Sequence, residues 1–368
     1  MRNMMRHKSL PSVGYMLIAL ALAACAGTPE PAMDIDATVD PKTPNVVKTF
    51  DVATTTLVPD SAMAWMIEDN DQAAPTFTPT PTATHTGTPV SPTPAPYKTP
   101  VFEVANEHTT IDCLNAVMDV FIDVFGIYVI STQSAPRDYV VHTANILAEF
   151  IDNDLDDVPD DPAVLAYLLE NNYVVPVWTK EIRETFWERA RGTFCEDHTG
   201  MAASMYYDED EWAIGGIKQS CTWDVNLEEV WHVVSRGWYG AYPEVFGNDE
   251  DINKTSLLRE AMNVARGGRF DSVPSKYPAG AWYKYHDASC RYHCQVSEYF
   301  YWALMANIGA LDPKMTDKCH DISNREVPEW HICTRSELEK VDKRVYNLLN
   351  NPEFRLPRNI PQGKYKGG

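Results

Sequence analysis

The chain has 368 residues and a formal net charge of −21 at neutral pH, with 52 acidic against 31 basic residues. A surface this acidic repels the phosphates of nucleic acids and the headgroups of anionic lipids, whereas it attracts divalent cations. The composition therefore argues against nucleic acid as a partner and suits a protein that binds metal ions.

The first residues have the three parts of an export signal. Basic residues precede an apolar run at 13–24 that is too short to span a membrane, and the run ends in the letters LAAC at 22–25. This pattern resembles the cleavage site of bacterial lipoproteins. The resemblance implies that residues 1–24 are removed as a signal peptide and that Cys25 carries a lipid anchor. An uncleaved anchor helix or a coincidental cysteine is the alternative.

The lipoprotein resemblance also implies a location and a domain order. A lipidated Cys25 places the protein outside the cytoplasm, on a bacterial membrane. Residues 25–100 lack sustained apolar periodicity, and their Thr/Pro-rich second half favours an extended, semi-rigid spacer. Residues 101–368 are rich in Trp, Tyr, Val and Leu, enough for a globular domain.

The globular part reads as mostly helical. A short β-branched and aromatic segment at 173–178 predicts a strand, with Pro176 favouring the edge of a sheet. Glycines are expected as helix C-caps at 237, 267 and 309. We therefore expect one domain of the mainly α class with a few short strands (α+β). Apolar spacing predicts helices over 111–125, 139–151, 163–170, 180–191, 226–236, 255–266, 297–308 and 336–349.

Seven cysteines follow Cys25, and in an exported protein disulfides are the default. The spacing suggests pairing of Cys319 with Cys333 and of Cys195 with Cys221. An odd number leaves one thiol over, and Cys113 in an apolar run is the candidate. A cluster of soft ligands could instead hold structural zinc, although oxidation favours disulfides to Cys290 and Cys294, or one between them. That cluster consists of His286, Cys290, His293 and Cys294.

Aspartates alternate in the loop between two predicted helices, in the sequence DNDLDDVPDD. Oxygen ligands at alternate positions of a tight loop can converge on one calcium ion. The segment resembles the EF-hand calcium loop over about a dozen residues. By that resemblance the metal ligands are the side chains of Asp152, Asp154 and Asp156, the carbonyl of Val158, and Asp160 directly or through water.

The loop departs from the EF-hand pattern at two positions. Asp157 stands at the sixth position in place of glycine, and Ala163 stands at the twelfth in place of glutamate. Aspartate tolerates the left-handed backbone, so we expect the turn to survive with fewer ligands. Pro159 removes a donor that paired EF-hands share, which favours a lone structural site. The alternative is a solvated acidic loop.

A second candidate metal site lies in the segment NLEEVWHVVSRG. Glu228 and His232 are four residues apart and share one helix face. The segment resembles the H-E-x-x-H helix of zinc metallopeptidases, with Glu228 in place of the first histidine. The resemblance implies that Glu228 and His232 bind zinc and that Glu229 is the general base. Glu298, at the start of a later helix, is where a gluzincin-type peptidase places its third ligand.

The same residues also have a purely structural interpretation. Glu229 would complete a capping box with Asn226, Glu298 would favour a helix N-terminus, and His232 would be a core histidine. Exchange of a histidine for a carboxylate also makes the site more anionic, which is compatible with a degenerate, inactive site. Replacing Glu229 with Gln separates these interpretations.

An aromatic stripe runs through residues 282–302 and is expected to be mostly core, with a sugar or peptide groove beside Glu298 as the alternative. No Ser/His/Asp order, phosphate loop or dinucleotide fingerprint is recognisable. Two functions follow: a tethered lipoprotein with a calcium loop and a zinc-peptidase-like site, or a non-catalytic, calcium-stabilised binding or adhesion module. The expected partners are the membrane, through the anchor, and a peptide or glycan ligand.

Overall fold

In the computed structural model, the described residues are 102–108, 110–201, 203, 205–251, 253–325 and 328–365. The predicted signal peptide, the lipidation site Cys25 and the spacer lie outside these residues. Within the described ranges, no helix combines the length and the apolar character that a membrane span requires.

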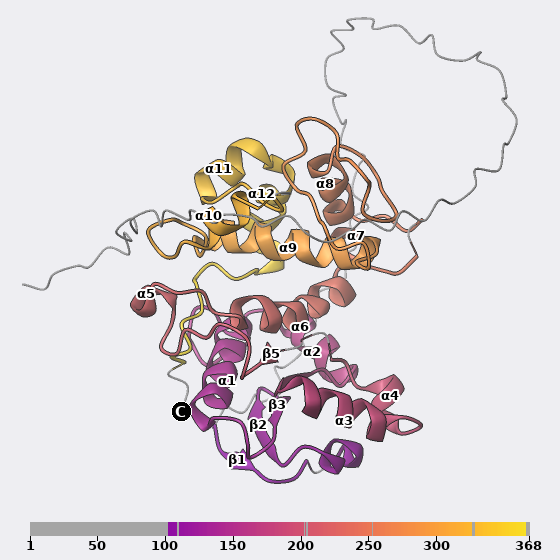
Figure 1. The fold of residues 1–368 in the computed structure, drawn as a ribbon, viewed down its shortest axis with the longest axis vertical. Coiled ribbons are helices and arrows are strands. Elements are labelled where there is room, and N and C mark those ends of the chain that lie inside the picture. Colours follow the sequence, from indigo (N-terminus) through magenta and orange to yellow (C-terminus); the bar gives the residue numbers. More distant parts are fainter. Residues whose placement is uncertain are drawn as a thin grey trace, which may run out of the picture. The chain divides into compact units, whose positions relative to one another are not determined.

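A mixed five-stranded sheet forms one end of the folded unit (Figure 1). The first three strands pair antiparallel, and the third, fourth and fifth pair parallel. The side chains of a strand alternate between the two faces of the sheet, so each strand contributes to both cores. In spatial order the strands are β1 (Val104–Ala105), β2 (Val120–Val124), β3 (Ile127–Ser131), β4 (Val174–Trp178) and β5 (Met205–Tyr206).

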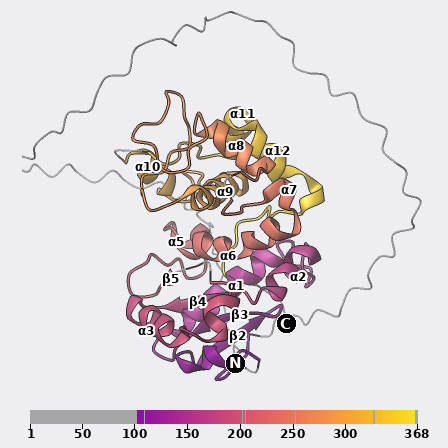
Figure 2. The same ribbon diagram turned by 90° about the vertical axis from the view of Figure 1, so that its right-hand side faces the viewer.

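Helices cover both faces of this sheet (Figure 2). The larger core contains Ile122, Val129 and Val175 together with α1 (Arg137–Ile151), α2 (Pro162–Glu170) and α6 (Asn226–Ala241). The smaller core, on the other face, contains Phe121, Ile130 and Trp178. It is closed by η1 (Asp112–Ala116), α3 (Lys180–Ala190) and α4 (Phe194–His198).

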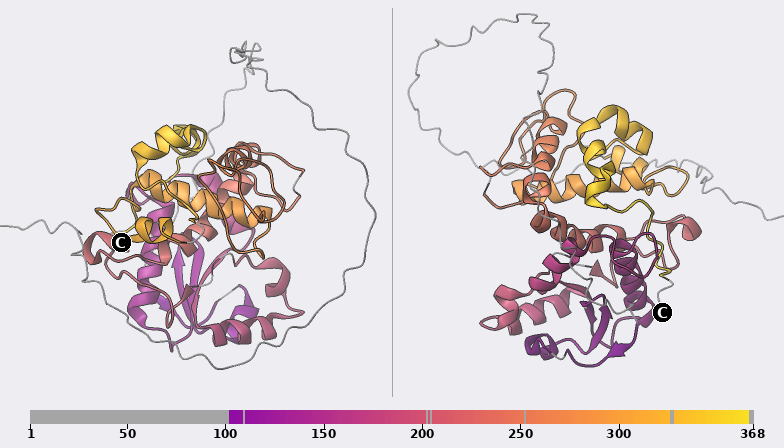
Figure 3. Two further views of the ribbon diagram at one scale, coloured as in Figure 1. Left: turned by 45° about the horizontal axis from the view of Figure 1, so that its top comes forward. Right: turned by 180° about the vertical axis from the view of Figure 1, so that it is seen from behind.

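The C-terminal helices pack on the side of α6 that faces away from the sheet (Figure 3). Helix α9 (Tyr292–Ile308) is buried along almost its whole length and contacts α6. The remaining elements are α5 (Ile217–Ser220), α7 (Pro243–Phe246), α8 (Leu257–Ala265), α10 (Lys318–Ser323), α11 (Arg335–Val341), α12 (Lys343–Asn350) and η2 (Pro352–Phe354).

The predicted fold class, mainly α with a few short strands, is confirmed, since the described residues form twelve α-helices and five strands. The helix predicted over 111–125 is wrong. That stretch contains η1 and then β2, because Phe121 and Ile122 bury their side chains on opposite faces of the sheet. Strand β4 is present, but it lies inside the sheet between β3 and the two-residue β5. The edge position expected from Pro176 is therefore wrong. A partner strand of two residues gives no recognisable pattern in the sequence.

Three predicted helices differ clearly from the structure. The helix predicted from residue 297 begins at Tyr292, so Glu298 lies within α9 and not at its N-terminus. Helix α6 continues past Gly237 to Ala241, and a Cβ on Gly237 would lie 2.4 Å from Cγ1 of Val164 in α2. The glycine is therefore required for close helix packing and not for a cap. The stretch 336–349 is divided at Asp342, whose carboxylate accepts hydrogen bonds from Trp282 and Tyr299 and from the N–H of Val345 at the start of α12.

Among the described residues, three disulfides are Cys113–Cys195, Cys290–Cys294 and Cys319–Cys333. The predicted pairing of Cys319 with Cys333 is confirmed, as is a bridge between Cys290 and Cys294 in place of zinc. The pairing of Cys195 with Cys221 and the free thiol at Cys113 are wrong. The sheet brings η1 beside α4, and this contact joins cysteines 82 residues apart.

Candidate functional site

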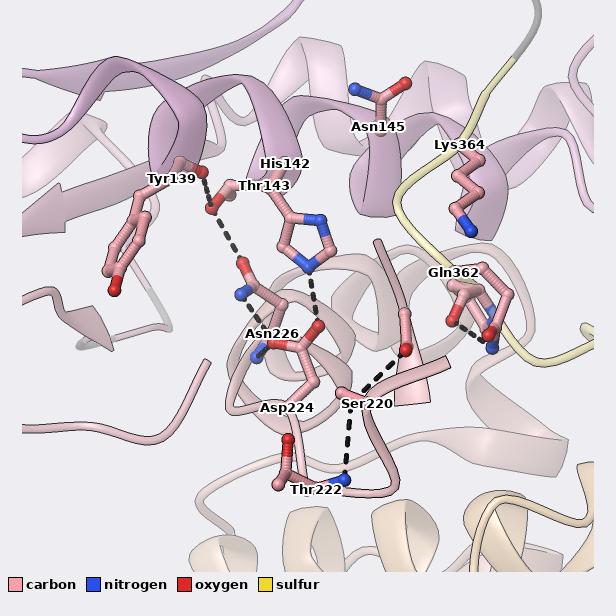
Figure 4. Close-up of polar contacts among 12 residues, drawn as sticks. Tyr139, His142, Thr143, Asn145, Ser220, Thr222, Asp224, Asn226, Gln362 and Lys364 are labelled. Atoms are coloured by element: carbon pink, nitrogen blue, oxygen red, sulfur yellow. Dashed lines mark hydrogen bonds and ion pairs between the residues drawn. The ribbon is translucent and has the colours of Figure 1, made fainter. Parts of the chain in front are cut away.

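A buried polar network fixes the start of α6 against α1 (Figure 4). His142 Nε2 hydrogen bonds with Asp224 Oδ2 at 2.6 Å, and Thr143 Oγ1 donates to Asn226 Oδ1 at 2.7 Å. The other Asp224 oxygen accepts from the backbone and side-chain amides of Asn226. Asn226 is therefore not the predicted N-cap; it holds the first turn of the helix that carries Glu228.

Helices α6 and α9 bring Glu228, His232 and Glu298 together. One donor atom from each residue lies within 4.8 Å of the other two. His232 Nε2 and Glu298 Oε1 are 3.5 Å apart, and both side chains are largely buried. The sequence predicted this ligand set from a motif and from one glutamate far along the chain. We call these three residues the helix centre.

The helix centre concentrates negative charge in a buried place. Burial raises the pKa of Glu298 well above its ordinary value, and the carboxylates of Glu228, Glu329 and Glu229 raise it further. Burial also raises the pKa of Glu228, although the positive charges of Lys318 and Arg325 act in the opposite direction. A bound cation would relieve this cost, because it stabilises carboxylates in their ionised form.

The imidazole of His232 is in the form that binds metals. Burial lowers its pKa to about 3, and the nearby charge of Arg236 acts in the same direction. A neutral imidazole keeps a lone pair for a metal ion. Beside it, the Tyr301 hydroxyl lies near Glu228 but makes no hydrogen bond of standard geometry within the described part of the chain.

A further carboxylate, that of Glu329, lies close to the helix centre and was not predicted. Its Oε1 accepts from the indole N–H of Trp302, one helical turn after Glu298, at 2.7 Å. Arg325 and His286 are 3.6 and 3.7 Å from Oε2. Burial raises the pKa of Glu329 to about 7. It lies between α10 and α11, outside any helix or strand, so the sequence gives no periodic signal that would have placed it here.

The predicted aromatic core is present around this site. Tyr283, Tyr292, Tyr299, Phe300, Tyr301 and Trp302 are buried, whereas Trp282 and Tyr285 are partly exposed. The aromatic residues therefore serve mainly to pack α9 into the core.

The acidic loop brings together three of its predicted ligands. One oxygen each of Asp152, Asp154 and Asp156 lies within 4.8 Å of the others. Asp152 is buried and accepts from the N–H groups of Asp156 and Asp157, at 3.1 and 2.9 Å. Asp157 adopts φ 69°, the left-handed conformation expected of the glycine at this position. The turn of the loop thus survives without glycine.

The two remaining predicted ligands are placed differently. Asp160 turns its Oδ2 toward the N–H of Asn153, at 2.8 Å, and burial raises its pKa to about 6. Val158 is exposed, and its N–H donates to Asp156 Oδ1 at 2.9 Å. A cavity of about 390 Å³ opens beside the loop, where Arg355 and Arg358 also contribute to the wall.

The C-terminal tail, residues 358–365, forms hydrogen bonds with the acidic loop and with the end of α1. Asn153 Oδ1 accepts from the N–H groups of Arg358 and Asn359, both at 2.7 Å. The buried carboxylate of Glu149 accepts from two further backbone N–H groups, and the Tyr365 hydroxyl donates to Asp152. These contacts span more than 200 positions in sequence, so no local pattern could have revealed them.

The chain was compared with family models, with curated proteins and with solved structures, and none of the three comparisons gave a match. The function therefore has to be inferred from the geometry of the helix centre and the acidic loop.

Proposed function

We propose that the chain is a zinc-dependent hydrolase of the peptidase type, in which Glu228, His232 and Glu298 bind the ion and Glu229 is the general base. The main support is the separation of His232 Nε2 from Glu298 Oε1, 3.5 Å. Two donors on a tetrahedral zinc ion, with bonds of about 2.1 Å, lie about 3.4 Å apart. The same separation exceeds that of a good hydrogen bond.

The chemistry of the donors agrees with this assignment. Zinc takes imidazole nitrogen and carboxylate oxygen, and catalytic zinc sites use three protein ligands and keep a fourth position open. A bound zinc ion would supply an activated water. Glu229 follows the ligand Glu228 directly, and its charge contributes to the raised pKa of Glu298, so we assign it the role of accepting a proton from that water. Two carboxylate ligands leave less positive charge on the ion, so we expect slow turnover.

The test uses the full chain in detergent, loaded with zinc, and a library of internally quenched peptides. Glu229→Gln should lower kcat by a factor of about 10² to 10⁴ with an unchanged zinc content, because it removes only the base. Glu188→Gln, on an exposed position of α3, is the matched control and should change neither quantity. Unchanged turnover of Glu229→Gln, or a wild-type chain that binds no zinc, would disprove the proposal.

A second candidate function is a calcium-stabilised binding module, and the acidic loop favours it. Asp152, Asp154 and Asp156 converge, and Asp157 adopts the turn that a calcium loop needs. Calcium is plentiful outside cells, so a site with few ligands suffices. If calcium raises the melting temperature while zinc neither binds nor supports turnover, this second function takes precedence.

We also propose that the protein is tethered to a bacterial membrane through lipidated Cys25, on the strength of the LAAC pattern at 22–25. Cys25→Ser should abolish incorporation of labelled fatty acid and shift the protein from the membrane to the soluble fraction. Incorporation that survives this substitution would refute the tether.

A further inference from the structure

The partly exposed positions of α6 form a single stripe. The helix is buried all round except at Glu228, Glu229, Arg236, Gly240 and Ala241. Residues four apart lie on the same face of a helix, so the stripe runs from Glu228 past His232 to Arg236. A ligand that binds the helix centre along this face of α6 therefore also contacts Arg236.

Among the described residues, Arg236 has no acidic partner. Its guanidinium makes no ion pair or hydrogen bond within these ranges and lies over the ring of Tyr239, 5.7 Å from the centroid. Five donors in a rigid planar fork, partly buried and unpaired, are suited to bind a carboxylate in two-point fashion.

Arg236 lies one helical turn from His232 on the same face of α6. Its guanidinium lies over the ring of Tyr239, and its charge also reaches His232, where it lowers the pKa of the imidazole. Four residues of helix span about 6 Å. An extended peptide covers this length in roughly two residues, at about 3.3 Å each.

We propose that Arg236 binds a carboxylate of the substrate within about two residues of the scissile bond, so that the substrates are peptides with an acidic side chain or a free C-terminus at that position. This inference rests on the proposed hydrolase function. It also answers an electrostatic difficulty, because an acidic site repels anionic substrates unless a fixed positive charge receives them.

The experiment measures kcat/KM of the zinc-loaded full chain on matched quenched peptides. One series varies a single residue two positions from the cleavage point among Glu, Gln and Lys; the other compares a free C-terminus with its amide. Wild type should prefer the carboxylate in at least one series by about 10-fold to 100-fold, in line with a charge-assisted hydrogen bond. The series that shows the preference identifies the source of the carboxylate.

Arg236→Gln should reduce that preference to near one, mainly by raising KM for the carboxylate peptide. Arg335→Gln is the matched control, since Arg335 also lies over a tyrosine ring, that of Tyr346 at 5.9 Å, and is distant in sequence from α6. It should leave the preference unchanged. A purely structural role for Arg236 would lower the rates of all peptides equally, which would overturn the inference.

The two proposals fail in different ways. An active wild type with no carboxylate preference, or with a preference that survives Arg236→Gln, refutes the role of Arg236 alone. A wild type that cleaves no peptide refutes the hydrolase and the role of Arg236 together. Zinc content, measured on every variant, shows whether a loss of rate reflects a loss of metal.

Discussion

The acidic loop and the helix centre are both clusters of metal-ligating side chains, yet they are built in opposite ways. The loop takes its ligands from one short stretch, and Asp154 and Asp156 are exposed to water. The helix centre takes its ligands from α6 and α9 and buries them. An exposed loop tolerates the absence of a cation, whereas buried carboxylates without one cost free energy of folding. Such a cost is easier to understand if the helix centre has a chemical role.

The largest expected effect is the selective loss of zinc from the helix centre or of calcium from the acidic loop. His232→Ala should abolish zinc binding to the full chain and leave calcium binding intact, because the loop does not share a ligand with α6. A double change, Asp154→Asn with Asp156→Asn, should do the reverse. Elemental analysis and calorimetry on the same samples measure both ions. Loss of both ions in either variant would show that the clusters are not independent.

The disulfides provide the next contrast. Cys113–Cys195 closes a loop of 82 residues, so replacing both with Ser should lower the free energy of unfolding by about 4 to 5 kcal/mol. Cys290–Cys294 closes a loop of only 4 residues, so replacing both with Ser should lower the free energy of unfolding by about 2 kcal/mol. Because Cys294 lies one turn before Glu298, the second variant should weaken zinc binding, and the first should not. Urea unfolding and zinc titration test both statements.

Protonation should weaken calcium binding at the loop. Burial raises the pKa of Asp160 to about 6, so the folded, calcium-free chain holds a proton that the unfolded chain releases near pH 4. Its stability contribution is therefore greatest below pH 4 and is lost as the pH rises through about 6. If Asp160 supports the ion, calcium affinity should fall about tenfold from pH 7 to pH 5. An affinity that is constant over this range would exclude Asp160.

The smallest expected effect concerns Asp157. Glycine adopts φ 69° without strain, so Asp157→Gly should raise the stability of the calcium-free chain by up to about 1 kcal/mol. Asp157→Val should lower it by a similar amount or more, since a β-branched residue resists this conformation. Thermal unfolding with chelator measures both. Equal stabilities of the two variants would mean that the turn rearranges without calcium.

The sequence predicted what depends on neighbouring residues. The helical spacing of α1, α2 and α3 is local, and so is the alternation of aspartates between α1 and α2. The ligands of the helix centre were also predicted, because Glu228 and His232 share one helix and Glu298 matches the third ligand of the gluzincin pattern. In each case a pattern of a few residues carries the geometry.

The errors concern contacts between distant segments. The apolar run at Val120–Val124 predicts a helix but forms a strand, since a short apolar run fits both periods until its partners in the sheet are known. Cys113 finds Cys195 only after η1 and α4 meet. The sequence does not single out Arg236, because its lack of an acidic partner among the described residues is a property of the folded chain alone.

If the chain is exported as proposed, its folding depends on segments that are far apart in sequence. The carboxylate of Glu149 is buried, and its backbone donors are Gln362 and Lys364, 213 and 215 positions later. A chain that emerges N-terminus first cannot satisfy this carboxylate until residues 362–364 have crossed the membrane. We therefore expect the globular part to stay protease-sensitive until that point of translocation. Protease resistance in chains arrested at residue 351 would contradict this order of events.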